Sequence, residues 1–394
     1  MNIDTLRDPQ WIEAMDPVAD EAAVTIIRAG GVEAMSTALE LLSNEPPDKR
    51  RPAGLDAFIA ATPAPEVNQE RIDAAQRWFS TWGAIGTSSL FCASLPETYC
   101  LPGIAQLLAI SGQLVDHVTR RIRMTGQMVF DVMQPGGITE DSAAMRALRR
   151  TRLMHGAIRS MLLHPGEVGR HLTSVSGARR LQWSSEFGKP INQLELVYTL
   201  MTFSHVILRS AERLGIALDR EKSDSYIYTW NVAGLVLGID PRLLPDESSQ
   251  AESVFETIKA MQARATDDAK ILVQALEASW NRQFAAHHVP LARPLMHSLF
   301  QSLLTDRTRA MLGIEVPGRI ASEMIALVMP AVEEIVHLSD ALFRALPPAA
   351  HVAAAVNVFF ARHETDEVQD RGMYDTLKHM RAWFDQVERA PEAV

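Results

Sequence analysis

Residues 145–163 read MRALRRTRLMHGAIRSMLL, and this stretch predicts a single amphipathic helix. Its apolar residues recur at helical spacing and form one stripe, made up of Leu148, Met154, Ile158, Met161 and Leu162. Helical periods of the same kind recur along most of the chain, and no clean alternating strand pattern interrupts them. The sequence therefore indicates an all-α fold.

Polar side chains interrupt the apolar side of this helix at three positions. Arg152, His155 and Arg159 are spaced i, i+3 and i+7, which places them on one face. Because an unpaired buried cation is costly, a bound anionic group that carries a metal would explain all three. A haem fits, with its iron on His155 and its propionates near the arginines. The alternative is a histidine packed in the core, with both arginines reaching water along the helix edge.

The preceding helix is predicted over residues 104–133, with bends at Gly112 and Gly126. One of its faces carries side chains at spacings i, i+4, i+7 and i+8, namely His117, Arg121, Met124 and Thr125. A turn at residues 135–137 ends this helix, and Thr139, with Asp141 nearby, is predicted to cap the helix that carries His155. Two successive helices with cationic polar faces favour a shared buried ligand.

The chain is predicted to divide into an N-terminal helical arm, residues 1–65, and a main helical body, residues 66–394. Within the arm, Asp16 is predicted to cap a helix that starts at Pro17, and the Gly30–Gly31 pair interrupts the helical pattern. A segment rich in proline and charge follows the arm's second helix and reads as a loop. We expect this arm to pack on the main body, where it could act as a lid.

Composition excludes several classes of protein. The apolar fraction of 47% and the charged fraction of 22% are typical of a globular protein, and a net charge of −10 argues against a nucleic-acid partner. The chain holds no apolar run long enough to span a membrane, so no stable membrane anchor is expected. Residues 1–15 lack the basic and apolar segments of an export signal, which favours a cytoplasmic protein.

The motifs of several common cofactor and metal sites are missing. Cys92 and Cys100 belong to no CxxC or CxxCH pattern, which excludes a structural zinc site and covalent haem attachment, and burial is expected for both. The chain has no dinucleotide-binding, Walker, HExxH or GxSxG motif. A di-iron bundle would need two ExxH units, and only Glu334–His337 is found.

The polar residues of the two helices match a known pattern. Arg121-x-x-Met124-Thr125, followed by Arg152-x-x-His155-x-x-x-Arg159, resembles the haem-binding signature of the latex-clearing protein family. These proteins are rubber oxygenases, related to a wider set of oxygenases. A second block, Trp230–Gly234 with Leu237–Ile239 and Leu244–Pro245, resembles a recognisable block of that wider family. The resemblance spans roughly residues 80–250.

The resemblance implies an all-α fold with a globin-like core and additional helices at both ends. It implies a non-covalent b-type haem with His155 as the proximal iron ligand. Arg121 and Thr125 would line the haem pocket, while Arg152 and Arg159 would support the cofactor through its propionates or through other residues. The implied chemistry is activation of dioxygen and oxidative cleavage of a carbon–carbon double bond in a hydrophobic, unsaturated small molecule.

The sequence departs from this family at the distal side of the implied haem. Met124 stands where the rubber oxygenases have a lysine, and a thioether can ligate haem iron. His117 is another candidate distal group, and no glutamate lies between Thr98 and Thr139 to act as the family's distal base. A non-catalytic haem sensor with a blocked distal site is therefore the alternative. The absent export signal favours a terpenoid-like metabolite over extracellular rubber.

Overall fold

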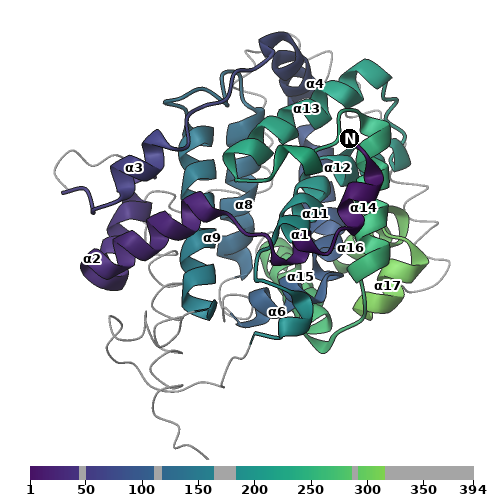
Figure 1. Ribbon diagram of the computed structural model, residues 1–394. Helices are drawn as coiled ribbons and strands as arrows, with labels where there is room; N and C mark the ends of the chain where they lie inside the picture. Colours follow the sequence, from purple (N-terminus) through teal and green to yellow (C-terminus); the bar gives the residue numbers. More distant parts are fainter. Residues whose placement is uncertain (44–49, 111–117, 164–182, 286–291, 316–394) are drawn as a thin grey trace, which may run out of the picture.

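The computed structural model describes residues 1–43, 50–110, 118–163, 183–285 and 292–315 of the chain (Figure 1). Every regular element in these ranges is helical, which confirms the predicted all-α fold. None of the helices described is both long enough and apolar enough to cross a membrane. The elements are η1 (Ile3–Arg7), α1 (Gln10–Glu13), α2 (Pro17–Leu41), α3 (Leu55–Ala60), α4 (Gln69–Ser89), η2 (Leu90–Ser94), α5 (Leu95–Tyr99), α6 (Pro102–Ile110), α8 (Val118–Met133), α9 (Ala143–Leu163), η3 (Ser185–Phe187), α11 (Gln193–Phe203), α12 (His205–Arg213), α13 (Arg220–Val236), η4 (Pro241–Leu243), α14 (Ser248–Gln262), α15 (Asp267–Ala285), α16 (Ala292–Leu303) and α17 (Asp306–Leu312).

Helix α9 carries the polar face predicted from the sequence, and it packs against both α2 and α8 (Figure 1). Leu153 and Ala157 of α9 are fully buried in one apolar cluster with Ile26 of α2. Gly156 allows the two helices to approach closely, because a Cβ atom there would lie 2.4 Å from the Ala19 carbonyl oxygen. The predicted N-terminal arm therefore shares a core with α9, and its boundary with the body stays a prediction.

The predicted start and interruption of the arm's long helix are confirmed. Asp16 precedes α2, and its side chain accepts a hydrogen bond from the Ala19 amide at 3.4 Å, with Pro17 as the first helical residue. Gly31 has a φ of 66°, which interrupts the helix at the predicted glycine pair. The helix then resumes and ends at Leu41.

The predicted cap of the His155 helix is wrong by three residues. Ser142 Oγ accepts a hydrogen bond from the Met145 amide at 3.1 Å, so Ser142 caps α9. The Thr139 hydroxyl instead donates to the Gly136 carbonyl oxygen at 3.0 Å, because Thr139 belongs to the preceding turn. The single helix predicted over residues 104–133 is represented by α6 and α8, and residues 111–117 between them lie outside the described part.

A buried π-helical segment, η2, leads from α4 into α5. It contains Cys92, and Cys100 directly follows α5; both are buried free thiols, as predicted. Burial raises the pKa of both thiols well above the ordinary value. Neither thiol is therefore poised as a nucleophile.

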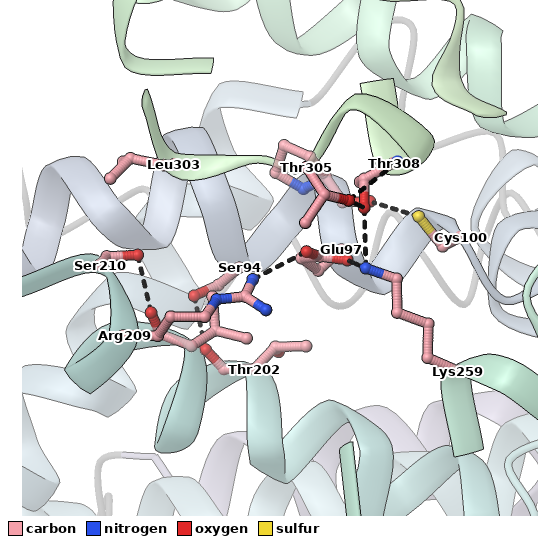
Figure 2. A network of polar contacts seen from close by, with 12 residues as sticks. Ser94, Glu97, Cys100, Thr202, Arg209, Ser210, Lys259, Leu303, Thr305 and Thr308 are labelled. Carbon is pink, nitrogen blue, oxygen red and sulfur yellow. Dashed lines mark hydrogen bonds and ion pairs between the residues drawn. The ribbon is translucent and has the colours of Figure 1, made fainter. Parts of the chain in front are cut away.

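Glu97 of α5 lies at the centre of a buried polar network (Figure 2). Its Oε1 accepts a hydrogen bond from Arg209 Nη2 at 2.8 Å, and its Oε2 accepts one from Lys259 Nζ at 2.6 Å. Lys259 Nζ also donates to Thr308 Oγ1 at 2.7 Å. The carboxylate thus links α5 to α12 and α14, and Lys259 extends the network to α17. These helices are far apart in sequence. Next to Glu97, Thr98 faces the cavity described below.

Candidate functional site

A cavity of about 300 Å³ lies between two groups of helices. Helices α8 and α9 line one part of it, and residues of α5, α6 and α11, with others before α11 and after α13, line the rest. Most lining side chains are apolar. The polar and ionisable ones are Thr98, Thr125, Arg150, Thr151, His155, Glu195 and Thr199. An apolar slot with a few polar groups is typical of a binding site for a small molecule or cofactor.

His155 is the side chain of this cavity best suited to hold a metal-bearing cofactor. It is partly exposed because it lines the cavity, and its Nδ1 atom is buried without a hydrogen-bond partner among the described residues. Burial, aided by the charge of Arg159 and opposed by that of Asp16, lowers the pKa of His155 to about 4. The imidazole is therefore neutral near pH 7, which is the form that ligates metals.

Two residues predicted on the neighbouring helix lie at the same cavity. Met124 and Thr125 of α8 line it together with His155. Arg121 lies about one turn earlier in α8, but its side chain is outside the described part, as is the whole of His117. The cavity thus brings together a thioether, a hydroxyl and an imidazole from two neighbouring helices.

Helix α9 meets the cavity along a stripe that differs from the predicted polar face. The lining residues of α9 are Ala147, Arg150, Thr151, Met154, His155 and Ile158. Because an α-helix advances by about 100° per residue, Arg152 and Arg159 lie on the side of His155 that points away from this stripe. His155 lies at the boundary between the stripe that lines the cavity and the predicted face that carries the two arginines. Only the first of these meets the cavity.

The guanidinium of Arg152 is bound by α2 and by the end of α13. Its Nε and Nη2 donate to the two carboxylate oxygens of Asp16 at 2.6 and 2.8 Å, and its Nη1 donates to the Val236 carbonyl oxygen at 3.1 Å. Gly238 makes room for this pair, because a Cβ atom there would lie 2.3 Å from Asp16 Oδ2 and its φ is +87°. This glycine belongs to the second block of the sequence resemblance.

Arg159 is held in a similar way. Its Nε donates to Asp20 Oδ1 at 2.6 Å and its Nη1 to the Ile191 carbonyl oxygen at 3.2 Å, while Nη2 is buried without a partner among the described residues. Neither Arg159 nor Arg152 lines the cavity. Their observed contacts anchor α9, and the charge of Arg159 acts on His155. A contact between either guanidinium and a haem propionate stays a prediction.

Arg150 is the arginine of α9 that lines the cavity, and the sequence does not single it out. Its Nη1 donates to Ser43 Oγ at 2.6 Å, just beyond the end of α2. Several arginines precede His155, so composition offers no reason to prefer this one. The signal that could have found it is its i, i+4, i+8 spacing with Met154 and Ile158, which also line the cavity.

Glu195 is a second cavity residue that the sequence does not reveal. It lies in the first turn of α11, is 4% exposed and lines the cavity. It forms a capping box with Asn192, whose side chain accepts from the Glu195 amide at 3.0 Å. Desolvation by burial raises the pKa of Glu195 to about 8, although backbone N–H bonds from Asn192 and Ile191 oppose the shift. The carboxyl group is therefore mostly neutral at pH 7.

This pKa predicts a pH dependence of stability that depends on Glu195. The folded protein keeps a proton on Glu195 that the unfolded chain loses near the ordinary pKa of 4.5, so the folded state binds more protons up to pH of about 8. As pH rises through this window, the unfolding free energy should fall by up to about 1.4 kcal/mol per pH unit relative to Glu195→Gln. Denaturant unfolding of both proteins at several pH values measures this difference; parallel pH profiles would contradict it.

Removing the charge of Asp16 should destabilise the fold. In Asp16→Asn the side chain still accepts the cap hydrogen bond, but the buried guanidinium of Arg152 loses its counter-charge. We expect the unfolding free energy to fall by about 3 kcal/mol, the lower end of the range for breaking a buried ion pair, because the amide oxygen still accepts one hydrogen bond. A double variant that also replaces Arg152 by methionine should recover part of this loss, because no unpaired charge remains buried. Chemical denaturation of the two variants and the parent tests both expectations.

Comparisons with known proteins show the family to which the chain belongs. Residues 77–333 match the family model described as "ER-bound oxygenase mpaB/B'/Rubber oxygenase, catalytic domain". Because the match covers more than half of the chain, the protein belongs to this family of oxygenases. The family resemblance inferred from the two haem-signature motifs is thereby confirmed.

One curated relative and one solved structure are similar to the chain over most of its length. A protein named rubber oxygenase from Streptomyces sp. (strain K30) is 21% identical over 321 residues, which cover 78% of this chain and 72% of the relative. The solved structure of latex clearing protein LCP in the closed state is similar with a TM-score of 0.67 and 17% identity, covering 95% of this chain and 90% of that chain. At this identity the structural likeness shows a shared fold.

Proposed function

We propose that the protein is a haem b-dependent oxygenase that activates dioxygen and oxidatively cleaves a carbon–carbon double bond in a hydrophobic, isoprenoid-like substrate. Membership of the oxygenase family and the name of the Streptomyces relative support the reaction class. The observation that carries the proposal is His155. It is a neutral imidazole at the wall of an apolar cavity, with a ring nitrogen that no described residue binds.

The residues of the cavity fit a haem held without a covalent bond. His155 would bind the iron, the leucine, isoleucine and methionine side chains would form an apolar slot, and Arg150 would offer a cation for a propionate. When bound, the haem would supply the redox chemistry with dioxygen. The protein would hold it, exclude water and place the substrate. Around the cavity, Arg152 and Arg159 fix the position of the helix that carries His155.

The distal roles belong to helix α8 in this proposal. Thr125, which lines the cavity, would donate a hydrogen bond to dioxygen, and Arg121 would stabilise negative charge that develops during the reaction. His117 stays a further candidate from the sequence, and it lies outside the described residues, as does the Glu334–His337 pair.

The position of Met124 supports an alternative function, a haem-binding sensor without turnover. Met124 lines the same cavity as His155, and its thioether could occupy the sixth position of the iron. The protein would then bind haem and respond to redox state or to a gas without turnover. The two functions differ in whether the reduced iron is open to small ligands.

Spectra of the purified protein, reconstituted with haem, test the proposal. An oxygenase should show a Soret band in the oxidised and reduced states, and the reduced band should shift when carbon monoxide is added. A blocked sensor should instead keep one six-coordinate spectrum in each state, unchanged by carbon monoxide. Absence of any Soret band after reconstitution would overturn both functions. An open site would then be assayed for carbonyl products from unsaturated terpenoids.

A further inference from the structure

We propose that Glu195 is a specificity-determining residue whose carboxyl group donates a hydrogen bond to an oxygen atom of the substrate. The substrate would then be an oxygenated isoprenoid, such as a ketone or an ester, rather than a pure hydrocarbon. This inference rests on the proposed function, because it assumes that the cavity receives the isoprenoid substrate.

The first support is the position of the side chain. Glu195 lines the cavity from α11, whereas the residues of the haem signature that line it come from α8 and α9. Space for the carboxyl group is provided by Gly103, because a Cβ atom there would lie 2.0 Å from Glu195 Oε1. A side chain at position 103 would push the carboxyl group out of its place.

The second support is the O–H group of the neutral Glu195 carboxyl, which has no acceptor among the described residues. The hydrogen bonds that Glu195 receives from described residues come from the backbone N–H groups of Asn192 and Ile191, and they occupy it as an acceptor. A neutral carboxyl group also carries an O–H donor, and no described residue accepts a hydrogen bond from it. Because burial without a partner is costly, an acceptor in the cavity would stabilise this group.

The third support is the lack of a nearby cation that would ionise the acid. No ion pair to Glu195 is found among the described residues. Helices α12 and α14, which pack against α11, carry the cations Arg209 and Lys259, and both of these donate to Glu97 of α5. The cation Lys189 lies 4.0 Å from Glu13 of α1, and no ion pair joins it to Glu195. The other ionisable groups that line the cavity, Arg150 and His155, lie on α9, and neither contributes to the pKa shift of Glu195.

A matched pair of probes tests the proposal: a farnesyl methyl ketone, and the hydrocarbon in which two hydrogens replace its carbonyl oxygen. Equilibrium dialysis of the haem-loaded, full-length protein gives both dissociation constants. We expect the parent to prefer the ketone by about fivefold beyond the ratio set by partition into an apolar solvent. Glu195→Leu should lose this preference, whereas Glu195→Gln should keep it, because the amide also donates and still suits the capping box.

The control variant is Glu256→Leu, which replaces an exposed carboxylate of α14 that does not line the cavity and should keep the preference. A second readout covers the case in which Glu195→Leu does not fold. The parent should show the infrared carbonyl band of a neutral carboxyl group, absent in Glu195→Gln and shifted by the ketone but not by the hydrocarbon. A preference that survives in Glu195→Leu, or a band that the ketone does not shift, would overturn the proposal.

Failure of this inference is separable from failure of the proposed function. Loss of the Soret band concerns the haem, while the ketone preference and the carboxyl band concern Glu195. Both binding readouts can also be taken on protein that carries no haem.

Discussion

Replacing His155 by alanine is expected to abolish the Soret band of the reconstituted protein. The imidazole lines the cavity, is held neutral by burial and by the charge of Arg159, and is the best iron ligand among the described lining residues. Alanine removes the ligand and enlarges an apolar space without disturbing the Arg152–Asp16 and Arg159–Asp20 pairs, so the fold should persist. Absorption spectra before and after haem addition measure the loss, and circular dichroism verifies the helical content.

Two controls separate iron ligation from a packing role. His205→Gln changes another neutral histidine, which lies at a tilt against Phe255 and does not line the cavity, so the Soret band of this variant should match that of the parent. Free imidazole added to His155→Ala should restore a Soret band by filling the vacated space. A His155→Ala protein that keeps the parental spectrum would show that another residue holds the iron.

Replacing Glu97 by leucine is expected to cause the largest loss of stability. The carboxylate is fully buried and pairs with Arg209 and with Lys259, both nearly buried (Figure 2). Leucine would leave the buried ammonium of Lys259 without its carboxylate partner, and it would leave the guanidinium of Arg209 with only the exposed carboxylate of Glu256 at 3.6 Å. Removing one member of a buried ion pair typically costs about 3–5 kcal/mol, and here two cations lose the same partner. Urea or thermal unfolding of the variant measures the loss.

The matched control is Glu256→Leu, which removes a second carboxylate that lies 3.6 Å from the same arginine. Its side chain is 54% exposed, so water and salt screen the interaction. We expect that variant to change the unfolding free energy by no more than about 0.5 kcal/mol. Equal losses in the two variants would mean that burial of Glu97 contributes nothing special, and would contradict the role assigned to the network.

Local features of the chain could be predicted well, because they depend on neighbouring residues. The cap at Asp16, the break at the glycine pair of α2 and the helix that carries His155 all follow from side-chain and backbone preferences within a few residues. The cap of α9 was missed because Ser142 and Thr139 are equally good caps by chemistry, and the turn before the helix decides between them.

The candidate site could be predicted only in part. Spacing grouped Met124 with Thr125 on one helix face, and the structure brings both to the cavity that His155 lines. Their roles at a haem stay a prediction. Spacing also grouped Arg152 and Arg159 with His155, yet their guanidiniums reach carboxylates of α2. Helical periodicity gives the angle of a side chain around its own axis, and it does not say which neighbouring helix lies at that angle.

The sequence by itself therefore determined the all-α fold, the helix of His155, the burial of both cysteines and the family to which the chain belongs. These follow from local periodicity, composition and motifs at fixed spacing. Only the tertiary structure decided that Arg150 and Glu195 line the cavity, and that Asp16 and Asp20 pair with the two signature arginines. These contacts join residues far apart in the chain, and the packing of α2 and α11 around α9 and the cavity creates them.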